Sequence, residues 1–308
     1  MKKETLVSIA ERSGCSISTV SRVLSGNAAK YRISQRTVAR VTEEVKRCNY
    51  TPSLLAKGLR TNRTDTIGLL IPNIENSFFA GVAGVVIRES RNYNYKVVVV
   101  DTQEDERNEQ DGLSALLARR VDGIVAAPCG SNSELFASVQ EGGMPLVLID
   151  RYLPDAGMLS YVTTDNYRGA VMATEYLLEN GHRRIGFLGS ISSTSSIQDR
   201  YLGYYKALLE NRIPLRQDWV IADRSNESDI FPEFTLPNDM PTAFVCNCDE
   251  TAYKLVNQLK AAGYSIPDDI SAVGYDNHIY STICNPRLTT IDVNSRVTVS
   301  YTHLTLPT

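Results

Sequence analysis

Histidine and tryptophan are scarce in this sequence, and it contains no long apolar run. The three histidines, His182, His278 and His303, are too few and too scattered for a histidine-rich metal centre. No apolar run approaches the roughly 20 residues that a membrane-spanning helix needs. Glu4 and Glu11 stand where a signal peptide would carry its apolar core, so we expect a cytoplasmic protein.

Catalytic and metal-binding motifs are missing as well. The six cysteines show neither CxxC nor zinc-ligand spacing, which favours reduced, buried thiols. There is no phosphate loop, no GxGxxG after a strand, no HExxH and no GxSxG. A Ser–His–Asp set can be drawn with His182 or His278, but no spacing supports it. We therefore expect no enzyme, no cofactor and no metal.

Charge is distributed unevenly along the chain. Residues 1–60 contain twelve Lys/Arg and four Glu, a net charge near +8. The whole chain has 32 basic and 35 acidic residues, which leaves 20 basic against 31 acidic in residues 61–308, or −11. This asymmetry is typical of a small nucleic-acid-binding head on an acidic body, because phosphate would repel an evenly acidic chain.

Two short helices joined by a glycine turn are predicted close to the N-terminus. Gly14 permits the left-handed turn that closes the first helix, and Ser16 caps the second. On the second helix Ile17, Val20 and Leu24 follow helical spacing, and we expect them to face inward.

The other side of that second helix is small, polar and basic. Ser18 and Arg22 lie four residues apart there, with Thr19 beside them. Such a pair of helices suits a DNA major groove, although helix spacing alone is equally compatible with a surface helical hairpin. The residues predicted to contact DNA are Ser16, Ile17, Ser18, Thr19 and Arg22. A third helix is predicted from Ser34, with Val38, Val41 and Val45 as its buried stripe.

From residue 66 onward, short apolar runs alternate with helical stretches. The runs are Ile67–Ile71, Val97–Val100, Gly123–Ala127, Leu146–Ile149, Ile185–Leu188, Ala243–Cys246 and Ser271–Tyr275. Strands buried on both faces with helices between them indicate parallel sheets in an α/β fold. The segment is roughly 230 residues long, which is more than a typical single domain, so we expect it to form two lobes.

The run from Thr5 to Gly26 resembles the DNA-binding headpiece of the lactose/galactose repressor (LacI/GalR) family. Tyr31–Ser34 and Tyr50–Ser53 fall where that family begins its third helix and its linker. The resemblance extends in the family's order to about residue 294. Its further segments are Ile67–Pro72, Arg120–Ile124, Gly181–Ile185, Pro267–Ser271 and Leu288–Ile291.

The resemblance implies the domain organisation. It predicts an all-α helix-turn-helix headpiece over residues 1–49 and a hinge or linker over 50–63. A two-lobed α/β domain like that of periplasmic binding proteins, with parallel sheets, would cover 64–294. The chain would cross between the lobes near 161–165 and 289–293.

In the family, the segment after the headpiece is a hinge helix that forms on DNA, pairs with its symmetry mate and wedges a leucine into the minor groove. Leu59 occupies that position. Gly58 is a poor helix former, by about 1 kcal/mol relative to Ala, so this hinge should depend more on DNA for its order. In the free protein the segment is equally interpretable as a plain linker.

The C-terminal end departs from the family pattern. Family members continue past the second crossing with another helix and a returning strand, whereas residues 295–308 match nothing expected. We interpret these residues as non-native sequence after a truncation; a divergent native C-terminus is the alternative.

Ligands of parallel α/β lobes bind beyond the carboxyl ends of the strands, so polar residues at those ends are candidates. The family usually has Asp where Asn73 stands and Pro where Ser77 stands, but it keeps Phe78 and Phe79. Either one ring lines the ligand site, which we assign to Phe78, or both rings pack in the core.

Charged residues follow two further predicted strands, and one more matches a family motif. Asp150 and Arg151 come directly after the run 146–149, while Arg200 and Asp276 match the family's effector-contacting arginine and aspartate. Carboxylate–arginine pairs can bracket the vicinal hydroxyls of a sugar. The alternatives are a surface ion pair for Arg200 and a turn or helix cap for Asp276.

Two departures bear on the ligand. Cys248 stands where relatives often carry a polar side chain, and Arg224–Asn226 is polar where purine-binding relatives place a stacking aromatic. We favour a mono- or oligosaccharide over a nucleobase.

The function that the resemblance implies is an allosteric repressor. A homodimer would bind double-stranded, pseudo-palindromic operator DNA, with half-sites about one helical turn (~34 Å) apart. The ligand can act as inducer or corepressor. The alternative is a cytoplasmic sugar-binding protein with a vestigial DNA-binding head.

Overall fold

A computed structural model describes residues 4–50, 63–130, 132–155, 157, 159–189, 194–221 and 234–293. The chain divides into two compact units, Met1–Thr64 and Asp65–Thr308, which we call the head unit and the body unit. The expectations for Leu59, Arg224–Asn226 and residues 295–308 fall outside the described residues. No helix in the described part is both long enough and apolar enough to cross a membrane.

Three helices build the head unit. They are α1 (Leu6–Ser13), α2 (Ile17–Leu24) and α3 (Gln35–Arg47). Each begins at a hydroxyl side chain that accepts a hydrogen bond from a backbone N–H of the first turn; these caps are Thr5, Ser16 and Ser34. Gly14 follows α1 with φ of 58°, so the predicted left-handed turn is present.

The head core is small and apolar. Ile9, Val20 and Val41, one from each helix, are fully buried. The prediction that Ile17 faces inward is wrong, because its side chain is 48% exposed. Ile17 is the first residue of α2, and helical side chains tilt toward the N-terminus, so it points past the end of the core. Val23 packs against the core instead.

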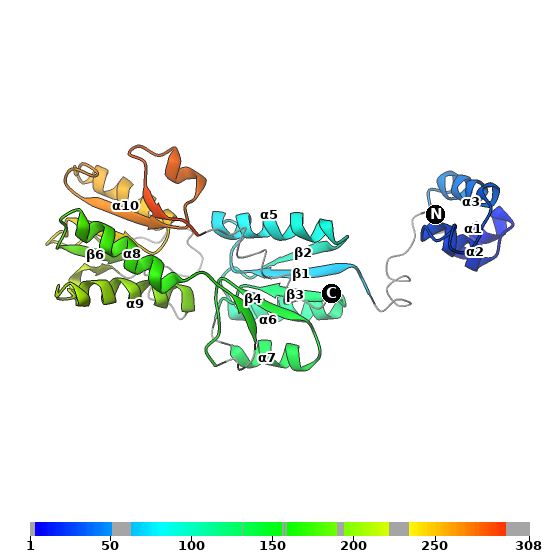
Figure 1. Cartoon of the computed structure of the whole chain (residues 1–308), viewed down its shortest axis with the longest axis horizontal. Helices are drawn as coiled ribbons and strands as arrows, with labels where there is room; N and C mark the ends of the chain where they lie inside the picture. Colours follow the sequence, from blue (N-terminus) through cyan, green and yellow to red (C-terminus); the bar gives the residue numbers. More distant parts are fainter. Residues whose placement is uncertain are drawn as a thin grey trace. The chain divides into compact units, whose positions relative to one another are not determined.

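The first lobe of the body unit is a parallel sheet of order β2-β1-β3-β4-β5. Its strands are β1 (Thr66–Ile71), β2 (Lys96–Asp101), β3 (Gly123–Ala126), β4 (Leu146–Ile149) and β5 (Ser160–Val162). Its helices are α5 (Ser77–Asn92), α6 (Glu106–Ala118) and α7 (Ser133–Glu141). Helix α5 covers one face, and α6 and α7 cover the other (Figure 1).

The second lobe is a parallel sheet of order β10-β9-β8-β6-β7. Its strands are β6 (Ile185–Leu188), β7 (Val220–Ile221), β8 (Ala243–Cys246), β9 (Ser271–Tyr275) and β10 (Thr289–Ile291). Its helices are α8 (Asn166–Glu179), α9 (Ser195–Glu210) and α10 (Asp249–Ala261), with two short 3₁₀ turns, η1 (Gln217–Trp219) and η2 (Ile279–Thr282). Helices α8 and α9 pack on one face and α10 on the other (Figure 1).

The predicted α/β class with parallel sheets and an all-helical head is confirmed. One strand differs from its prediction: β2 is not buried on both faces, and Val99 is 36% exposed. Strand β2 is the edge of its sheet and pairs only with β1, so fewer neighbours cover it. The chain leaves the first sheet after Val162 and enters the second lobe at α8.

Candidate functional site

Hydroxyl side chains form a hydrogen-bonded cluster at the start of α2. Ser16 Oγ accepts the Thr19 N–H at 3.1 Å and lies 2.8 Å from both Ser18 Oγ and Thr19 Oγ1. Ser16, Ile17 and Ser18 are exposed, and Thr19 is half-buried. This end of the helix therefore offers hydroxyl groups and one apolar side chain, which can contact base edges and thymine methyl groups in a major groove.

Arg22 lies further along α2 and is stacked on an aromatic ring. Its Cζ is 4.0 Å from the ring centroid of Tyr31, which precedes α3 and is 46% exposed. Stacking holds the guanidinium in one orientation, so less rotamer freedom is lost when it binds. Sequence analysis missed this contact, since no helical or strand period connects the two positions.

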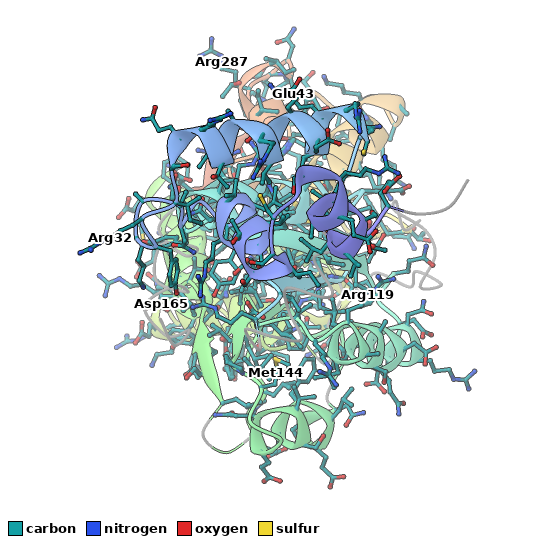
Figure 2. All side chains as sticks on the ribbon, turned by 90° about the vertical axis from the view of Figure 1, so that its right-hand side faces the viewer. Arg32, Glu43, Arg119, Met144, Asp165 and Arg287 are labelled. Atoms are coloured by element: carbon teal, nitrogen blue, oxygen red, sulfur yellow. The ribbon has the colours of Figure 1, made fainter. Side chains whose placement is uncertain are left out.

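Further arginines of the head unit are exposed. Arg32 extends away from the ribbon in Figure 2, and Arg36 is also exposed. Arg40 donates from Nη2 to Cys15 Sγ at 3.2 Å. Exposed guanidinium groups next to a polar helix can contact DNA phosphates and fix the register of that helix on the duplex.

In the body unit, polar side chains of both lobes meet beyond the carboxyl ends of the strands. We call this region the interlobe site. Its residues are Asn73, Phe78, Asp150, Arg151, Thr164, Arg200, Asn247, Cys248 and Asp276. Phe78 lies in the first turn of α5 and Arg200 lies in α9, whereas the other residues belong to segments that follow β1, β4, β5, β8 and β9.

Arg200 is the centre of the network in the second lobe. Its Nε donates to Asn166 Oδ1 at 2.8 Å, and its Nη2 lies 3.3 Å from Asp276 Oδ1. Nη1 donates to the backbone oxygen of Asn247, and Cζ is 3.8 Å from the ring centroid of Tyr275. Arg200 is 6% exposed, so it is a buried and fully engaged guanidinium rather than a surface ion pair.

Arg151 is the corresponding centre in the first lobe. Nη1 and Nη2 donate to the two carboxylate oxygens of Glu104, each at 2.8 Å, and Nη1 also donates to Pro128 O at 3.0 Å. Its Nε lies 3.7 Å from Asp150 Oδ2. Sequence analysis did not predict Glu104, because it belongs to a loop far from Arg151 in the chain.

Burial dominates the electrostatics of the two aspartates. It raises the pKa of Asp150, although the positive charges of Arg151 and Arg200 lower it. It raises the pKa of Asp276 to about 8, against the lowering effect of Arg200 and with support from the Asp150 charge. Both carboxyl groups therefore favour a proton more than an exposed aspartate does, and a protonated carboxyl can donate as well as accept.

Hydrogen bonds join the two lobes on one side of this site. Glu250, in the first turn of α10, accepts from Asn76 Nδ2 at 2.9 Å, from Ser77 Oγ at 2.9 Å and from Ser77 N–H at 3.3 Å. The positive end of the α5 dipole adds to this attraction, because Asn76 and Ser77 begin that helix.

A second set of hydrogen bonds joins the lobes through Tyr152. Its N–H donates to Ser195 Oγ at 2.8 Å, and its hydroxyl donates to the Asp199 carboxylate at 3.2 Å. The ring stacks on Tyr161 with centroids 5.3 Å apart. Sequence analysis identified none of these lobe-joining residues, because they lie on different lobes and share no local pattern.

Three other predicted residues lie at the edge of this network. Asn73 Oδ1 accepts from the N–H groups of Glu75 and Asn76, so it shapes the loop before α5. Phe79 is buried in the core of the first lobe, whereas Phe78 is half-buried and packs edge-to-face against it. Cys248 Sγ is 3.1 Å from Thr251 Oγ1, and burial raises the pKa of its thiol to about 12, so the thiol is protonated.

Several buried polar atoms of the interlobe site have no hydrogen-bond partner among the described residues. They are Arg151 Nε, Thr164 Oγ1 and Asn247 Oδ1. A buried polar atom without a partner costs free energy, so each suits a ligand hydroxyl or a water admitted when the lobes separate. Sequence analysis missed Thr164 and Asn247, although both follow strands and the strand-end rule could have found them.

Comparison with known proteins agrees with this architecture. Residues 64–299 match the family described as periplasmic binding proteins and sugar binding domain of LacI family, and residues 5–53 match bacterial regulatory proteins, lacI family. The HTH-type transcriptional repressor PurR of Photobacterium profundum is 31% identical over 291 residues, which are 93% of this chain and 86% of that protein.

Solved structures are similar over much of the chain. A lac repressor dimer bound to operator and the anti-inducer ONPF has a TM-score of 0.80 at 24% identity, covering 98% of this chain and 92% of that chain, and this shows the fold. A LacI family regulator from Lactobacillus casei with bound sucrose has a TM-score of 0.67 at 25% identity, covering 77% of this chain and 89% of the other. The chain is thus a member of the LacI family of bacterial regulatory proteins, DNA-binding transcriptional regulators rather than enzymes.

Proposed function

We propose that this protein is a repressor whose affinity for operator DNA is set by a sugar bound at the interlobe site. One observation carries the proposal. A capped helix with an exposed polar and basic side stands in the head unit, and each of the two parallel α/β lobes has a buried arginine paired with a carboxylate, Arg151 with Glu104 and Arg200 with Asp276.

For DNA reading, we assign base contacts to the exposed side of α2. Ser16, Ser18 and Thr19 would bond base edges, Ile17 would contact a thymine methyl, and Arg22 would reach a guanine. The exposure of Ile17 supports its role on DNA while excluding it from the core. We also propose that Leu59, in a hinge over residues 50–63, acts as a minor-groove wedge.

For the effector, the charge balance favours a neutral polyol. Arg151 is already paired with Glu104 and Arg200 with Asp276, so neither guanidinium needs an anionic ligand. Asp150 adds a further buried carboxyl group, which gives a phosphate or carboxylate no positive charge to pair with. Hydroxyl groups can both donate to and accept from this set, as a mono- or oligosaccharide requires.

We propose that the protein works as a homodimer on a pseudo-palindromic operator in the cytoplasm. Apolar side chains exposed around η2 support a self-association surface, because Ile279 and Ile283 are 68% and 70% exposed. A dimer would place two heads on half-sites about 34 Å apart. Closing or opening of the lobes would change the spacing of the two hinges and thereby operator affinity.

An operator selected from a random DNA library tests the proposal by gel shift. Arg22→Ala should weaken binding and relax base preference, whereas the exposed Arg212→Ala in the body unit serves as the control. An unchanged footprint would remove α2 from the interface.

A thermal-shift screen of sugars tests the ligand. A sugar at 100 times its dissociation constant should stabilise the chain by about 2.7 kcal/mol. Asp276→Ala should abolish the response to that sugar while sparing DNA binding without it. A normal response in this variant would show that the interlobe site is misplaced, and equal, weak binding to every DNA tested, with or without sugar, would refute the repressor assignment.

A further inference from the structure

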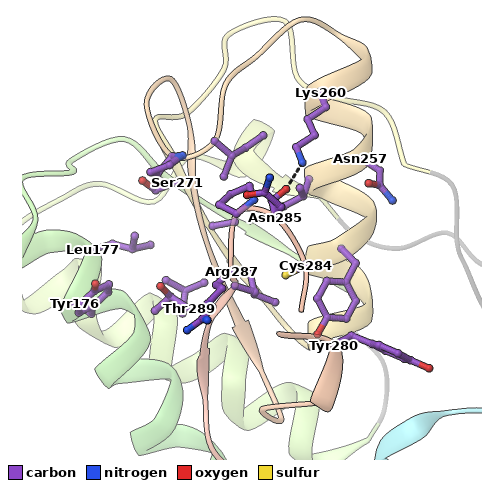
Figure 3. Close-up of a pocket in the computed structure, with 18 of the residues that line it drawn as sticks. Tyr176, Leu177, Asn257, Lys260, Ser271, Tyr280, Cys284, Asn285, Arg287 and Thr289 are labelled. Atoms are coloured by element: carbon purple, nitrogen blue, oxygen red, sulfur yellow. Dashed lines mark hydrogen bonds between the residues drawn. The ribbon is translucent and has the colours of Figure 1, made fainter. Parts of the chain in front are cut away.

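The segment after β9 connects the interlobe site with the self-association surface around η2. Asp276 belongs to the interlobe site and follows β9 directly, and Ile279 begins η2 only three residues later. Three residues span at most about 11 Å, even when they are fully extended. Tyr280 and Cys284 of the same segment lie beside α10 (Figure 3). A small shift of Asp276 can therefore reach the exposed side chains of Ile279 and Ile283.

The backbone at the start of this segment has an unfavourable conformation. Asp276 has φ of 105°, and Asn277 has φ of 53°. Asparagine and aspartate tolerate the left-handed region, at φ of about +50 to +70°, better than most residues do. The φ of Asp276 lies beyond that region, so surrounding contacts have to hold it. Strained residues of this kind cluster at ligand clamps and switch regions.

Asp249 provides such contacts from the first turn of α10. Its Oδ2 accepts the His278 N–H at 2.7 Å, and its Oδ1 accepts the Thr290 hydroxyl at 2.5 Å. Thr290 Oγ1 in turn accepts the Asn277 N–H at 3.3 Å. One carboxylate thus holds both residues that follow Asp276, one directly and the other through Thr290.

The carboxylate of Asp249 is buried, and a glycine makes room for it. Asp249 is 1% exposed. A Cβ at Gly274 in β9 would lie 2.3 Å from Asp249 Oδ1, which is closer than a side chain allows. Glycine in a strand often marks such a close approach. The carboxylate can therefore reach β10 and the end of β9 only because residue 274 has no side chain.

Hydrogen bonds continue from Asn277 into η2. The Ser281 hydroxyl donates to Asn277 Oδ1 at 3.2 Å, and Ser281 is buried. In the sequence, Ser281 lies between Ile279 and Ile283, whose side chains are exposed. A continuous set of polar contacts therefore runs from Asp249 to the self-association surface.

The same turn of α10 contacts the interlobe site and the first lobe. Cys248 precedes Asp249 and belongs to the interlobe site. Glu250 follows Asp249 and accepts hydrogen bonds from Asn76 and Ser77 of the first lobe. A relative movement of the lobes therefore acts on the turn that carries Asp249.

We infer that Asp249 is a positioning residue that couples the interlobe site to the self-association surface. By holding Asn277 and His278, it makes the orientations of Asp276 and of η2 depend on each other. A ligand that moves Asp276 then changes the affinity of one copy of the chain for another, and dimerisation changes the affinity for that ligand by the same factor. The inference rests on the proposed function, namely a sugar at the interlobe site and a homodimer that associates around η2.

Sedimentation equilibrium of the full chain measures the dimer dissociation constant without any ligand. Asp249→Ala removes both acceptors and should raise this constant at least about tenfold, because a hydrogen bond to a charged group is lost. Asp249→Asn keeps an acceptor for the His278 N–H and should stay within about threefold of the parent. Thr290→Val removes only the bridging hydroxyl and should raise the constant by more than about threefold.

Asp269→Ala is the matched control for these variants. Asp269 also accepts a backbone N–H, that of Ser265 at 2.7 Å, in the same lobe but outside residues 276–283. We expect it to dimerise as the parent does. Thermal melts establish which variants are folded, and Thr290→Val replaces Asp249→Ala in every comparison if the latter does not fold.

A double-mutant cycle tests the coupling itself. Asp276→Asn weakens the pair with Arg200 and should raise the dimer dissociation constant about threefold in the parent. In Asp249→Ala, where η2 is already released, the same change should have an effect of less than about 1.5-fold. A merely structural role of Asp249 predicts equal factors in both backgrounds.

Three results would overturn the inference alone: equal factors in this cycle, a dimeric parent whose dissociation constant Asp249→Ala leaves unchanged, or an Asp269→Ala dimer that is weakened as much as that of Asp249→Ala. A parent chain that stays monomeric at every concentration would overturn the homodimer of the proposed function and the inference with it.

Discussion

Arg200 and Asp276 should stabilise the second lobe as a coupled pair, and a double-mutant cycle can measure this. We take Arg200→Met, which keeps an unbranched side chain but removes every donor, together with Asp276→Asn and the double variant. In the parent protein, Arg200 donates to Asn166 and the Asn247 carbonyl and pairs with Asp276. Each variant therefore removes a defined part of one buried network.

The expected magnitudes follow from burial. Above about pH 8, where the Asp276 carboxyl is ionised, Arg200→Met leaves it without its cation, and breaking a buried pair in this way costs about 3–5 kcal/mol of unfolding free energy. Asp276→Asn leaves Arg200 with Asn166, the Asn247 carbonyl and the Tyr275 ring, so it should cost about 1–3 kcal/mol. The double variant should be more stable than the sum of the two costs predicts, by about 1–3 kcal/mol.

Urea unfolding followed by tryptophan fluorescence measures these values. Trp219 is the only tryptophan of the sequence; it is 5% exposed in the second lobe and donates from Nε1 to the Asp239 carbonyl at 2.7 Å. Its emission therefore reports on the lobe that carries the pair. If the unfolding free energy falls with urea concentration at the same slope in every variant, the variants alter stability and not the extent of unfolding. Strictly additive costs, or a cost below about 1 kcal/mol for Arg200→Met, would refute the coupled network.

Three further perturbations address other parts of the molecule. Tyr31→Leu should weaken operator binding about two- to fivefold, since an exposed cation–π contact contributes roughly 0.5–1 kcal/mol. Gel shift measures this, with the exposed Tyr93→Leu in the body unit as the control. Equal operator affinities of Tyr31→Leu and the parent would show that the ring does not position Arg22. Glu250→Gln should lower affinity for the sugar found by screening about tenfold, because a charged acceptor between the lobes is lost. If calorimetry shows an unchanged affinity, the hydrogen bonds of Glu250 to Asn76 and Ser77 do not stabilise the bound form. The pKa of Asp276 is raised to about 8 in the folded chain, above its value near 4 when unfolded, so the folded state binds the extra proton between these values. Stability should therefore fall as pH rises from about 4 to about 8 in the parent, level off above about 8, and fall less in Asp276→Asn. Parallel pH profiles of the two proteins would contradict the raised pKa.

Much of the fold could be predicted because burial leaves a continuous apolar signal. The runs predicted at Leu146–Ile149, Ile185–Leu188, Ala243–Cys246 and Ser271–Tyr275 coincide with strands β4, β6, β8 and β9. Strands β5, β7 and β10 have two or three residues each, too few for a periodic pattern.

The rule that ligands bind beyond the carboxyl ends of parallel strands also indicated residues of the interlobe site. It placed Asp150 and Arg151 after one strand and Asp276 after another, and the structure brings all three close to the Arg200 network. The partners of these groups could not be predicted. Glu104 reaches Arg151 through a loop, and such long-range contacts leave no trace in local spacing. The stacking of Arg22 on Tyr31 could not be predicted for the same reason.

Ser77, the first residue of α5, contributes hydrogen bonds that join the two lobes of the body unit. Ser77 supplies two of the three donors that hold Glu250, one from its backbone and one from its hydroxyl. Proline is well tolerated at the opening position of a helix but has no N–H, so Ser77→Pro would keep α5 intact while deleting both donors. A substitution at this one position can therefore weaken the hydrogen bonds between the lobes without changing any residue of the interlobe site.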